Sequence, residues 1–102
     1  MMIIIAIFTV KTEFIEDFRA FEKRAALIMQ DYAGVIERTV VVNHNNDSDR
    51  LKEIHVVSFP NARAFSAYQQ DIRIAAIAYL REKSVIQTEL HIGETGPIYA
   101  AS

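Results

Sequence analysis

The segment Ile54-His55-Val56-Val57-Ser58-Phe59-Pro60-Asn61 has the pattern of a buried strand that passes directly into a helix. Its β-branched and aromatic residues favour a strand. Its apolar residues stand at both odd and even positions, which is typical of a strand covered on both faces. Pro60 ends the strand because proline has no backbone N–H to donate to a neighbouring strand. Asn61 is a suitable N-cap for the helix that follows.

The residues after Asn61 have the apolar spacing of a helix. Its inward-facing residues are expected to be Phe65, Tyr68, Ile72, Ala76 and Tyr79 or Leu80. We expect an irregularity at Gln70-Asp71, where two short helices meet. The charged run Arg81-Glu82-Lys83 ends the helix, and a strand of alternating polarity over Ser84–Ile92 follows it.

The first half of the chain predicts a similar strand and helix. The segment Met2–Val10 is apolar at both parities, as expected of a second central strand. Thr12 is a suitable N-cap for a helix that ends near Tyr32, and Gly34 is a typical signal for its C-terminus. The predicted buried stripe of this helix comprises Phe14, Phe18, Phe21, Ala25 and Ile28.

A strand over Val35–Asn43 and a polar connection over His44–Asp49 join the two halves. The chain therefore predicts an α+β fold of the ferredoxin-like βαββαβ type. Its antiparallel four-stranded sheet has the spatial order fourth, first, third, second strand, with both helices on one face. The two central strands are too apolar to leave the other face in water, so we expect a homodimer that covers it.

Composition narrows the possible functions. The 102 residues are 51% hydrophobic and contain no linker, so residues 1–102 are expected to form a single domain with a tail over 93–102. This tail fits either an arm on a neighbour or a frayed end. The absence of cysteine excludes thiol chemistry and agrees with a cytoplasmic location. The charge of −2 argues against a nucleic-acid partner, and Lys11 ends the apolar start too early for a membrane span.

The segment His55-Val56-Val57-Ser58-Phe59-Pro60-Asn61, followed by Phe65, Tyr68, Asp71 and Arg81, resembles small bacterial proteins of unknown function in the dimeric α+β barrel superfamily. In those proteins a strand ending in Phe-Pro-Ser leads into a helix with spaced tyrosine and arginine residues. The superfamily also includes antibiotic-biosynthesis-type and haem-degrading monooxygenases and muconolactone-isomerase-like enzymes. The resemblance therefore implies a fold and a pocket near the helices or the dimer seam, but no particular reaction.

Few polar side chains are candidates for chemistry. His55 lies within an apolar strand and is a candidate catalytic base, and Tyr68 is a candidate catalytic residue that orients a substrate. Arg38, Tyr79 and Arg81 are candidate ligand-binding residues. Each also has a structural explanation: a hydrogen-bonded core histidine, packed tyrosines, an arginine stem lying over apolar surface, and a basic residue at a helix end.

No metal or other cofactor is expected, because His44, His55 and His91 lack second ligands at the usual spacing. Two hypotheses follow from the sequence. The first is a small-molecule-binding protein or a cofactor-free enzyme that acts on an aromatic or polyketide-like compound. The second is a non-catalytic homodimeric structural or interaction module, in which the sheet serves assembly alone and His55 is a core residue.

Overall fold

The computed structural model describes residues 1–42 and 49–100. The elements occur in the order β1 (Met2–Lys11), a 3-10 turn (Thr12–Phe14), α1 (Ile15–Gln30), β2 (Val35–Val42), β3 (Arg50–Phe59), α2 (Ala62–Gln69), α3 (Ile72–Ser84) and β4 (Val85–Glu94). This is the predicted βαββαβ order, with the second helix divided in two.

The sheet has four antiparallel strands in the order β2-β3-β1-β4, which confirms the predicted topology. The apolar strands β1 and β3 lie at the centre and pair over their whole length, with Ala6 opposite His55. The register fixes the faces of the sheet, because residues directly opposite each other in an antiparallel pair point to the same side. Ala6 and His55 are both buried, so His55 points to the covered side.

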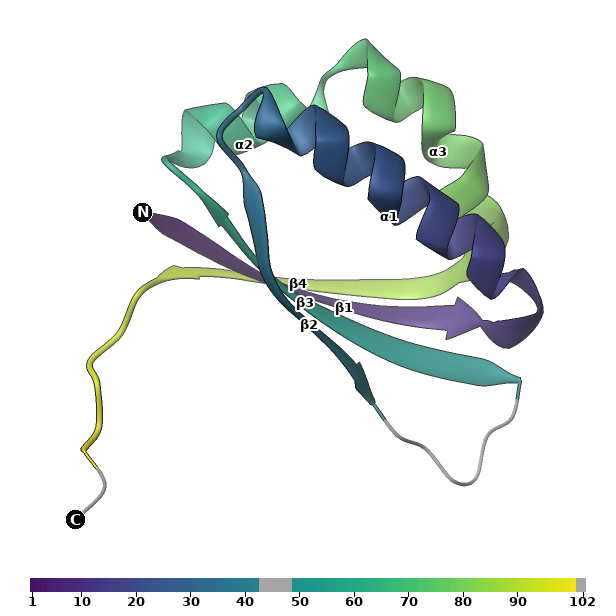
Figure 1. Cartoon of the computed structure of the whole chain (residues 1–102), viewed down its shortest axis with the longest axis horizontal. Coiled ribbons are helices and arrows are strands. Elements are labelled where there is room, and N and C mark those ends of the chain that lie inside the picture. The colour runs from purple at the N-terminus through teal and green to yellow at the C-terminus, as the bar shows by residue number, and fades with distance from the viewer. Residues whose placement is uncertain (43–48, 101–102) are drawn as a thin grey trace.

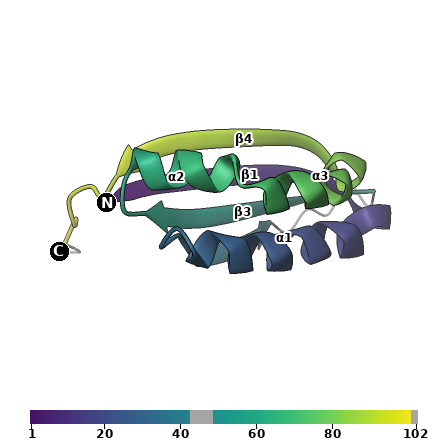
Figure 2. The ribbon, with the colours of Figure 1, turned by 90° about the horizontal axis from the view of Figure 1, so that it is seen from above.

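All the labelled helices lie on one side of the sheet (Figure 1). Seen from above, β4 runs along the edge beyond α2 and α3, whereas α1 lies on the side of these helices away from β4 (Figure 2). The core lies between these layers. Its buried apolar side chains are Ile4, Ala6, Phe8, Val10, Phe18, Phe21, Ala25, Ile28, Met29, Val57, Phe59, Ile77 and Leu80.

The opposite side of the sheet, here called the open face, has no helix over it among the described residues (Figure 1). Its central residues alternate with the buried residues of β1 and β3 and continue onto β2. They are Ile3, Ile5, Ile7, Ile54, Val56 and Val40. The sequence pattern predicted such an apolar second face.

The ends of α1 differ from the sequence prediction in detail. Thr12 is not the N-cap, because the 3-10 turn intervenes and Phe14 occupies that position. At the other end, the Ala33 N–H donates to the Gln30 carbonyl and the Gly34 N–H to the Met29 carbonyl, as in a Schellman motif. Ala33, with φ 57°, adopts the left-handed conformation, which glycine would have been expected to supply.

Gly34 is required for close packing. A Cβ at this position would lie 2.5 Å from Cε1 of Phe59 and would also overlap the Met29 side chain. We therefore expect Gly34→Ala to lower the free energy of unfolding by about 1–3 kcal/mol, the usual cost of an overpacked core. Urea denaturation measures this change. Gly93→Ala is the matched control, because no atom lies within 4 Å of its added Cβ; equal effects of the two substitutions would contradict the prediction.

The helical region after β3 breaks at the predicted place. Asn61 accepts a hydrogen bond from the Ala64 N–H at 2.9 Å and caps α2, and Asp71 accepts one from the Arg73 N–H at 2.8 Å and caps α3. Gln70 and Asp71 separate the two helices, as expected.

The break changes which face of α3 is buried. Ile72 and Tyr79 are 82% and 59% exposed, whereas Ile77 and Leu80 are buried. The predicted inward positions of Ile72 and Ala76 are therefore wrong, and of the alternatives Tyr79 and Leu80 only Leu80 is buried. The prediction treats the region as one continuous helix, but Gln70 and Asp71 interrupt it and change the direction in which the later residues point. Ser84 also belongs to α3 rather than to the last strand, because its hydroxyl donates to the Leu80 carbonyl at 2.7 Å.

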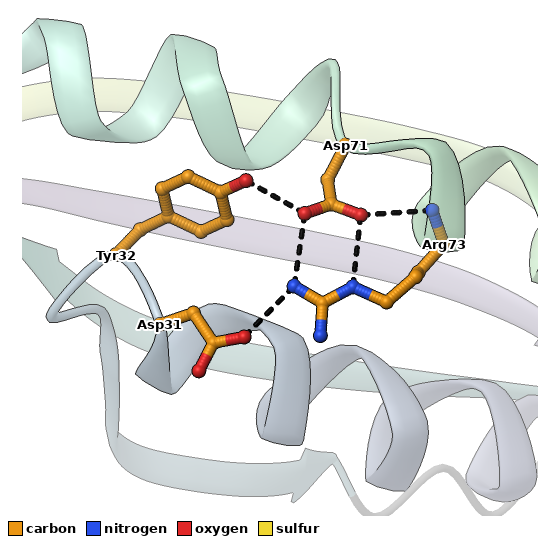
Figure 3. A network of polar contacts seen from close by, with 4 residues as sticks. All are labelled: Asp31, Tyr32, Asp71 and Arg73. Atoms are coloured by element: carbon orange, nitrogen blue, oxygen red, sulfur yellow. Dashed lines mark hydrogen bonds and ion pairs between the residues drawn. The ribbon is translucent and has the colours of Figure 1, made fainter.

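A polar network fastens this break to the end of α1 (Figure 3). The Tyr32 hydroxyl donates to Asp71 at 2.6 Å, and the Arg73 guanidinium donates to Asp71 at 2.9 Å and to Asp31 at 2.8 Å. These donors hold the pKa of Asp71 well below its usual range, with Arg73 as the largest cause. The network fixes where α3 begins and hence which residues it presents to the sheet.

The remaining segments are the predicted polar connection between β2 and β3 and the C-terminal tail. The polar connection predicted over 44–49 falls almost wholly in residues 43–48, which lie outside the described residues. In the tail, Ile98 and Tyr99 are 96% and 88% exposed in the single chain. None of the described helices is long and apolar enough to cross a membrane.

Candidate active site

A cavity of about 260 Å³ lies between the covered face of the sheet and the helices. Most of its wall is apolar, formed by Ile4, Ala6, Phe8, Phe21, Met29, Ile36, Val57, Phe59, Phe65, Ile74 and Leu90. The polar lining comprises Glu22, His55, Tyr68, Gln69, Arg81 and Thr88. Leu90 lines the cavity and is nevertheless 47% exposed, so the cavity opens along β4. An apolar cavity with a few convergent polar groups is the usual form of a small-molecule site.

His55 lies between two carboxylates. Its Nε2 is 2.7 Å from Oε2 of Glu53, and its Nδ1 is 3.4 Å from Oε2 of Glu22. An Nε2–H that donates to this carboxylate leaves Nδ1 facing Glu22. Phe8 packs against the imidazole ring at 5.1 Å between centroids. These contacts fix the ring and direct Nδ1 toward Glu22 at the cavity wall.

Glu53 is the buried support of this arrangement. It is 3% exposed, and its Oε1 has no hydrogen-bond partner among the described residues. The Arg19 guanidinium lies 3.6 Å from that oxygen and supplies a compensating charge. Glu53 does not line the cavity itself. Its place behind His55 suits a group that positions the imidazole.

Burial raises the pKa of the Glu22 carboxyl from 4.5 to about 7. His55 and Arg81 lower this pKa and Glu53 raises it, but the loss of solvation has the largest effect. Burial also raises the pKa of Tyr68 to about 12, so its hydroxyl stays protonated at neutral pH and acts as a hydrogen-bond donor. A carboxyl that titrates near pH 7 can both take and return a proton under physiological conditions.

The raised pKa of Glu22 predicts that stability depends on pH. The folded protein holds the Glu22 proton more tightly than the unfolded chain, so the stabilisation is complete below pH 4.5 and is lost as the pH rises through about 7. We expect the free energy of unfolding to fall by on the order of 3 kcal/mol over this window. Urea denaturation from pH 4.5 to 8 measures the change.

Two variants test the origin of this pH dependence. Glu22→Gln, which cannot ionise, should give a flatter profile, whereas Glu16→Gln on the exposed side of α1 should keep the wild-type profile. A Glu22→Gln profile as steep as that of the wild type would assign the effect to another group.

Arg81 lies on the cavity wall and its Nη2 donates to the Thr88 hydroxyl at 2.8 Å. Within residues 1–42 and 49–100, no carboxylate forms an ion pair with Arg81. Thr88 lies on β4, so this hydrogen bond links Arg81 of α3 to β4 at the cavity wall. The structure thus places His55, Tyr68 and Arg81, three residues singled out from the sequence, on one cavity.

The other two candidates lie elsewhere. Arg38 is opposite Val56 in the sheet and lies on the open face, away from the helices. Tyr79 is 59% exposed on the outer side of α3, so the expectation that it faces inward is wrong. Neither residue lines the cavity.

The sequence reading missed Glu22 and Glu53. A signal for Glu22 existed, because it lies four residues after Phe18 and three before Ala25, on the buried stripe of α1. Glu53 shares the parity of His55 and Val57 on β3, which becomes informative once the side of His55 is known. In the described part of the chain, no group of three His, Cys, Asp or Glu side chains is placed to hold a metal ion.

No family model matches the chain, and no curated protein matches it in sequence. Solved structures do match it. The cofactor-independent oxygenase SnoaB from Streptomyces nogalater has a TM-score of 0.67 at 14% identity, over 95% of this chain and 94% of that one. A putative antibiotic biosynthesis monooxygenase from Nitrosomonas europaea has a TM-score of 0.67 at 15% identity, over 97% of this chain and 100% of that one.

The chain shares the ferredoxin-like fold of these two structures. A protein of unknown function from Rhodopseudomonas palustris also has this fold, with a TM-score of 0.75 at 11% identity over 94% of this chain and 84% of that one. These likenesses confirm the predicted α+β fold class and the structural resemblance. At such identities they show the fold alone, so function must be argued from the site.

Proposed function

We propose that this protein is a cofactor-free enzyme that binds an aromatic or polyketide-like compound in the cavity and removes a proton from it. The observation that carries the proposal is the Glu22 carboxyl, with a pKa of about 7, beside His55 in an otherwise apolar cavity. A base works best when its pKa lies near the working pH. Phenols, enols and activated methylene groups are substrates from which such a base removes a proton.

Each polar group has a role in this proposal. Ionised Glu22 accepts the proton, and His55, which lies 3.4 Å from this carboxyl, lowers its pKa. Arg81 stabilises the negative charge that develops on the substrate, and the protonated Tyr68 hydroxyl donates a hydrogen bond. The apolar walls strengthen these interactions by excluding water.

The names of the structural neighbours support a reaction of the deprotonated substrate with dioxygen. SnoaB is described as a cofactor-independent oxygenase. A deprotonated phenol or enol gives up electrons to dioxygen more readily than its neutral form, so removal of a proton prepares a substrate for such a reaction. Oxygen uptake is therefore a second readout beside loss of substrate.

A compound screen tests the proposal. Hydroxylated naphthalenes, anthrones and cyclic 1,3-diketones are incubated with the protein in air and under nitrogen, and absorbance and oxygen uptake are followed. We expect turnover of at least one class, and we expect His55→Ala and Tyr68→Phe to reduce binding or turnover. If neither variant changed binding or turnover of any compound, the proposal should be abandoned.

The open face supports a second element of the proposal, a homodimer formed through the sheet. Isoleucine and valine side chains dominate this face, and an apolar area of this kind usually marks an interface. The cavity lies on the other side of the sheet, so assembly and ligand binding are compatible. The existence of the cavity argues against the alternative of a purely structural module.

A further inference from the structure

We propose that the compound bound in the cavity is a small hydroxylated aromatic acid, whose carboxylate pairs with Arg81 while its ring lies against the apolar wall. This inference rests on the proposed function, because it concerns the same cavity. It goes further by naming the charge and the size of the substrate.

The first argument is the incomplete pairing of Arg81. Its guanidinium is a planar fork of donors that matches a carboxylate in two parallel hydrogen bonds. Among the described residues, the guanidinium forms one hydrogen bond, from Nη2 to the Thr88 hydroxyl at 2.8 Å. That contact comes from a neutral group, and no carboxylate of the described residues lies within ion-pair distance of the guanidinium. An arginine with free donors on the wall of an apolar cavity is suited to bind an anion.

The second argument is the balance of charge around the cavity. Glu53 is compensated by Arg19 at 3.6 Å and by contact with His55 at 2.7 Å. Of the Glu53 and Glu22 carboxyls, that of Glu22 lines the cavity, and its pKa of about 7 means that it is largely neutral in slightly acidic solution. Arg81 then supplies a net positive charge that a monoanionic ligand neutralises. A neutral ligand would leave that charge without a partner in an apolar surrounding.

The third argument is size. The cavity volume of about 260 Å³ is below the roughly 300–1,000 Å³ of sites that hold drug-sized ligands. A compound of about one or two fused rings fits this space better than a larger polycyclic one. Phe8, Phe21, Phe59 and Phe65 line the cavity, and their rings favour an aromatic ligand.

Fluorescence titration with 1-hydroxy-2-naphthoate tests the inference, because this probe is itself fluorescent and the protein contains no tryptophan. Its methyl ester, which has the same rings and no charge, is the comparison ligand. We expect the acid to bind at least about tenfold more tightly than the ester, because only the acid can form a charged hydrogen-bonded pair with Arg81. Arg81→Gln should abolish that difference and Arg81→Lys should retain part of it.

Two further variants separate loss of the contact with Arg81 from loss of structure. Thr88→Val keeps the guanidinium but removes the hydroxyl that orients it, and should weaken binding of the acid by roughly threefold. Arg63→Gln, on the exposed surface of α2, is the matched control and should bind like the wild type. Circular dichroism establishes that each variant is folded.

The pH of the titration adds a readout that packing alone would not change. Glu22 interacts electrostatically with four residues, His55, Glu53, Arg81 and Tyr68. Ionisation of Glu22 adds a negative charge beside the ligand. The acid should therefore bind more tightly at pH 6 than at pH 8, and Glu22→Gln should reduce this difference.

Equal affinities for acid and ester, unchanged affinity in Arg81→Gln, or absence of binding by both probes at millimolar concentration would each overturn the inference. Tight binding of the ester with turnover of neutral compounds would overturn it while leaving the proposed function intact. Selective binding of the acid without any turnover would support the inference and count against the proposed reaction.

Discussion

Replacing Glu22 with glutamine is expected to lower kcat by about 100-fold or more for any compound that the screen shows to be turned over. Glutamine has nearly the same size and keeps a carbonyl oxygen near His55, but it cannot accept the substrate proton. The wild-type rate should rise with pH through about 7, because the ionised carboxyl is the active form. The rate of the Glu22→Gln variant should not show this rise with pH. Steady-state kinetics from pH 5 to 9 measure both effects.

Glu16→Gln is the matched control for this experiment. It makes the same chemical change on the same helix at an exposed position and should leave kcat unchanged. A Glu22→Gln rate within about threefold of the wild type would show that another group removes the proton. His55 would then be the next residue to test, since it contacts Glu22 at 3.4 Å.

Introducing a charge at the centre of the open face is expected to dissociate the proposed homodimer. Ile5 lies on the central strand β1, opposite Val56 on β3 and His91 on β4. In a two-fold symmetric interface each substitution occurs twice, so Ile5→Asp would bury two unpaired carboxylates. The dissociation constant should rise at least about 100-fold, equivalent to about 3 kcal/mol. Analytical ultracentrifugation over a range of concentrations measures it.

Leu27→Asp provides the control for this second experiment. Leu27 is 66% exposed on α1, on the helical side of the molecule, so the same chemical change there should leave the dimer intact. A wild-type protein that sediments as a monomer would refute the proposed assembly. So would an Ile5→Asp protein with an unchanged dissociation constant.

Periodicity predicted the order of the elements because it reports burial directly. Strands apolar at both parities, such as Met2–Lys11, lie at the centre of the sheet, and alternating strands lie at its edges. Local capping chemistry was equally informative at Asn61. It failed at Thr12, where a 3-10 turn displaced the start of α1. Helix starts depend on how the preceding strand ends, which the spacing of apolar residues does not report.

The candidate site was only partly predictable. His55 was recognisable as a polar residue in an apolar strand, and Tyr68 and Arg81 as polar residues near helix positions that face the sheet. Tyr79 was misplaced because the break at Asp71 shifts the helical phase of α3. Glu22 and Glu53 went unnoticed, since a carboxylate on an amphipathic helix or strand usually faces water.

The sequence by itself determined the fold class, the strand order, the break between α2 and α3 and the apolar character of both sheet faces. Each depends on residue type and spacing within one element or between neighbouring elements. Only the tertiary structure decided that His55 faces the helices, because either parity of an apolar strand can point either way. It also brought Glu22 from α1, His55 from β3 and Arg81 from α3 around one cavity. The raised pKa of Glu22 arises from that packing, which no single stretch of sequence contains.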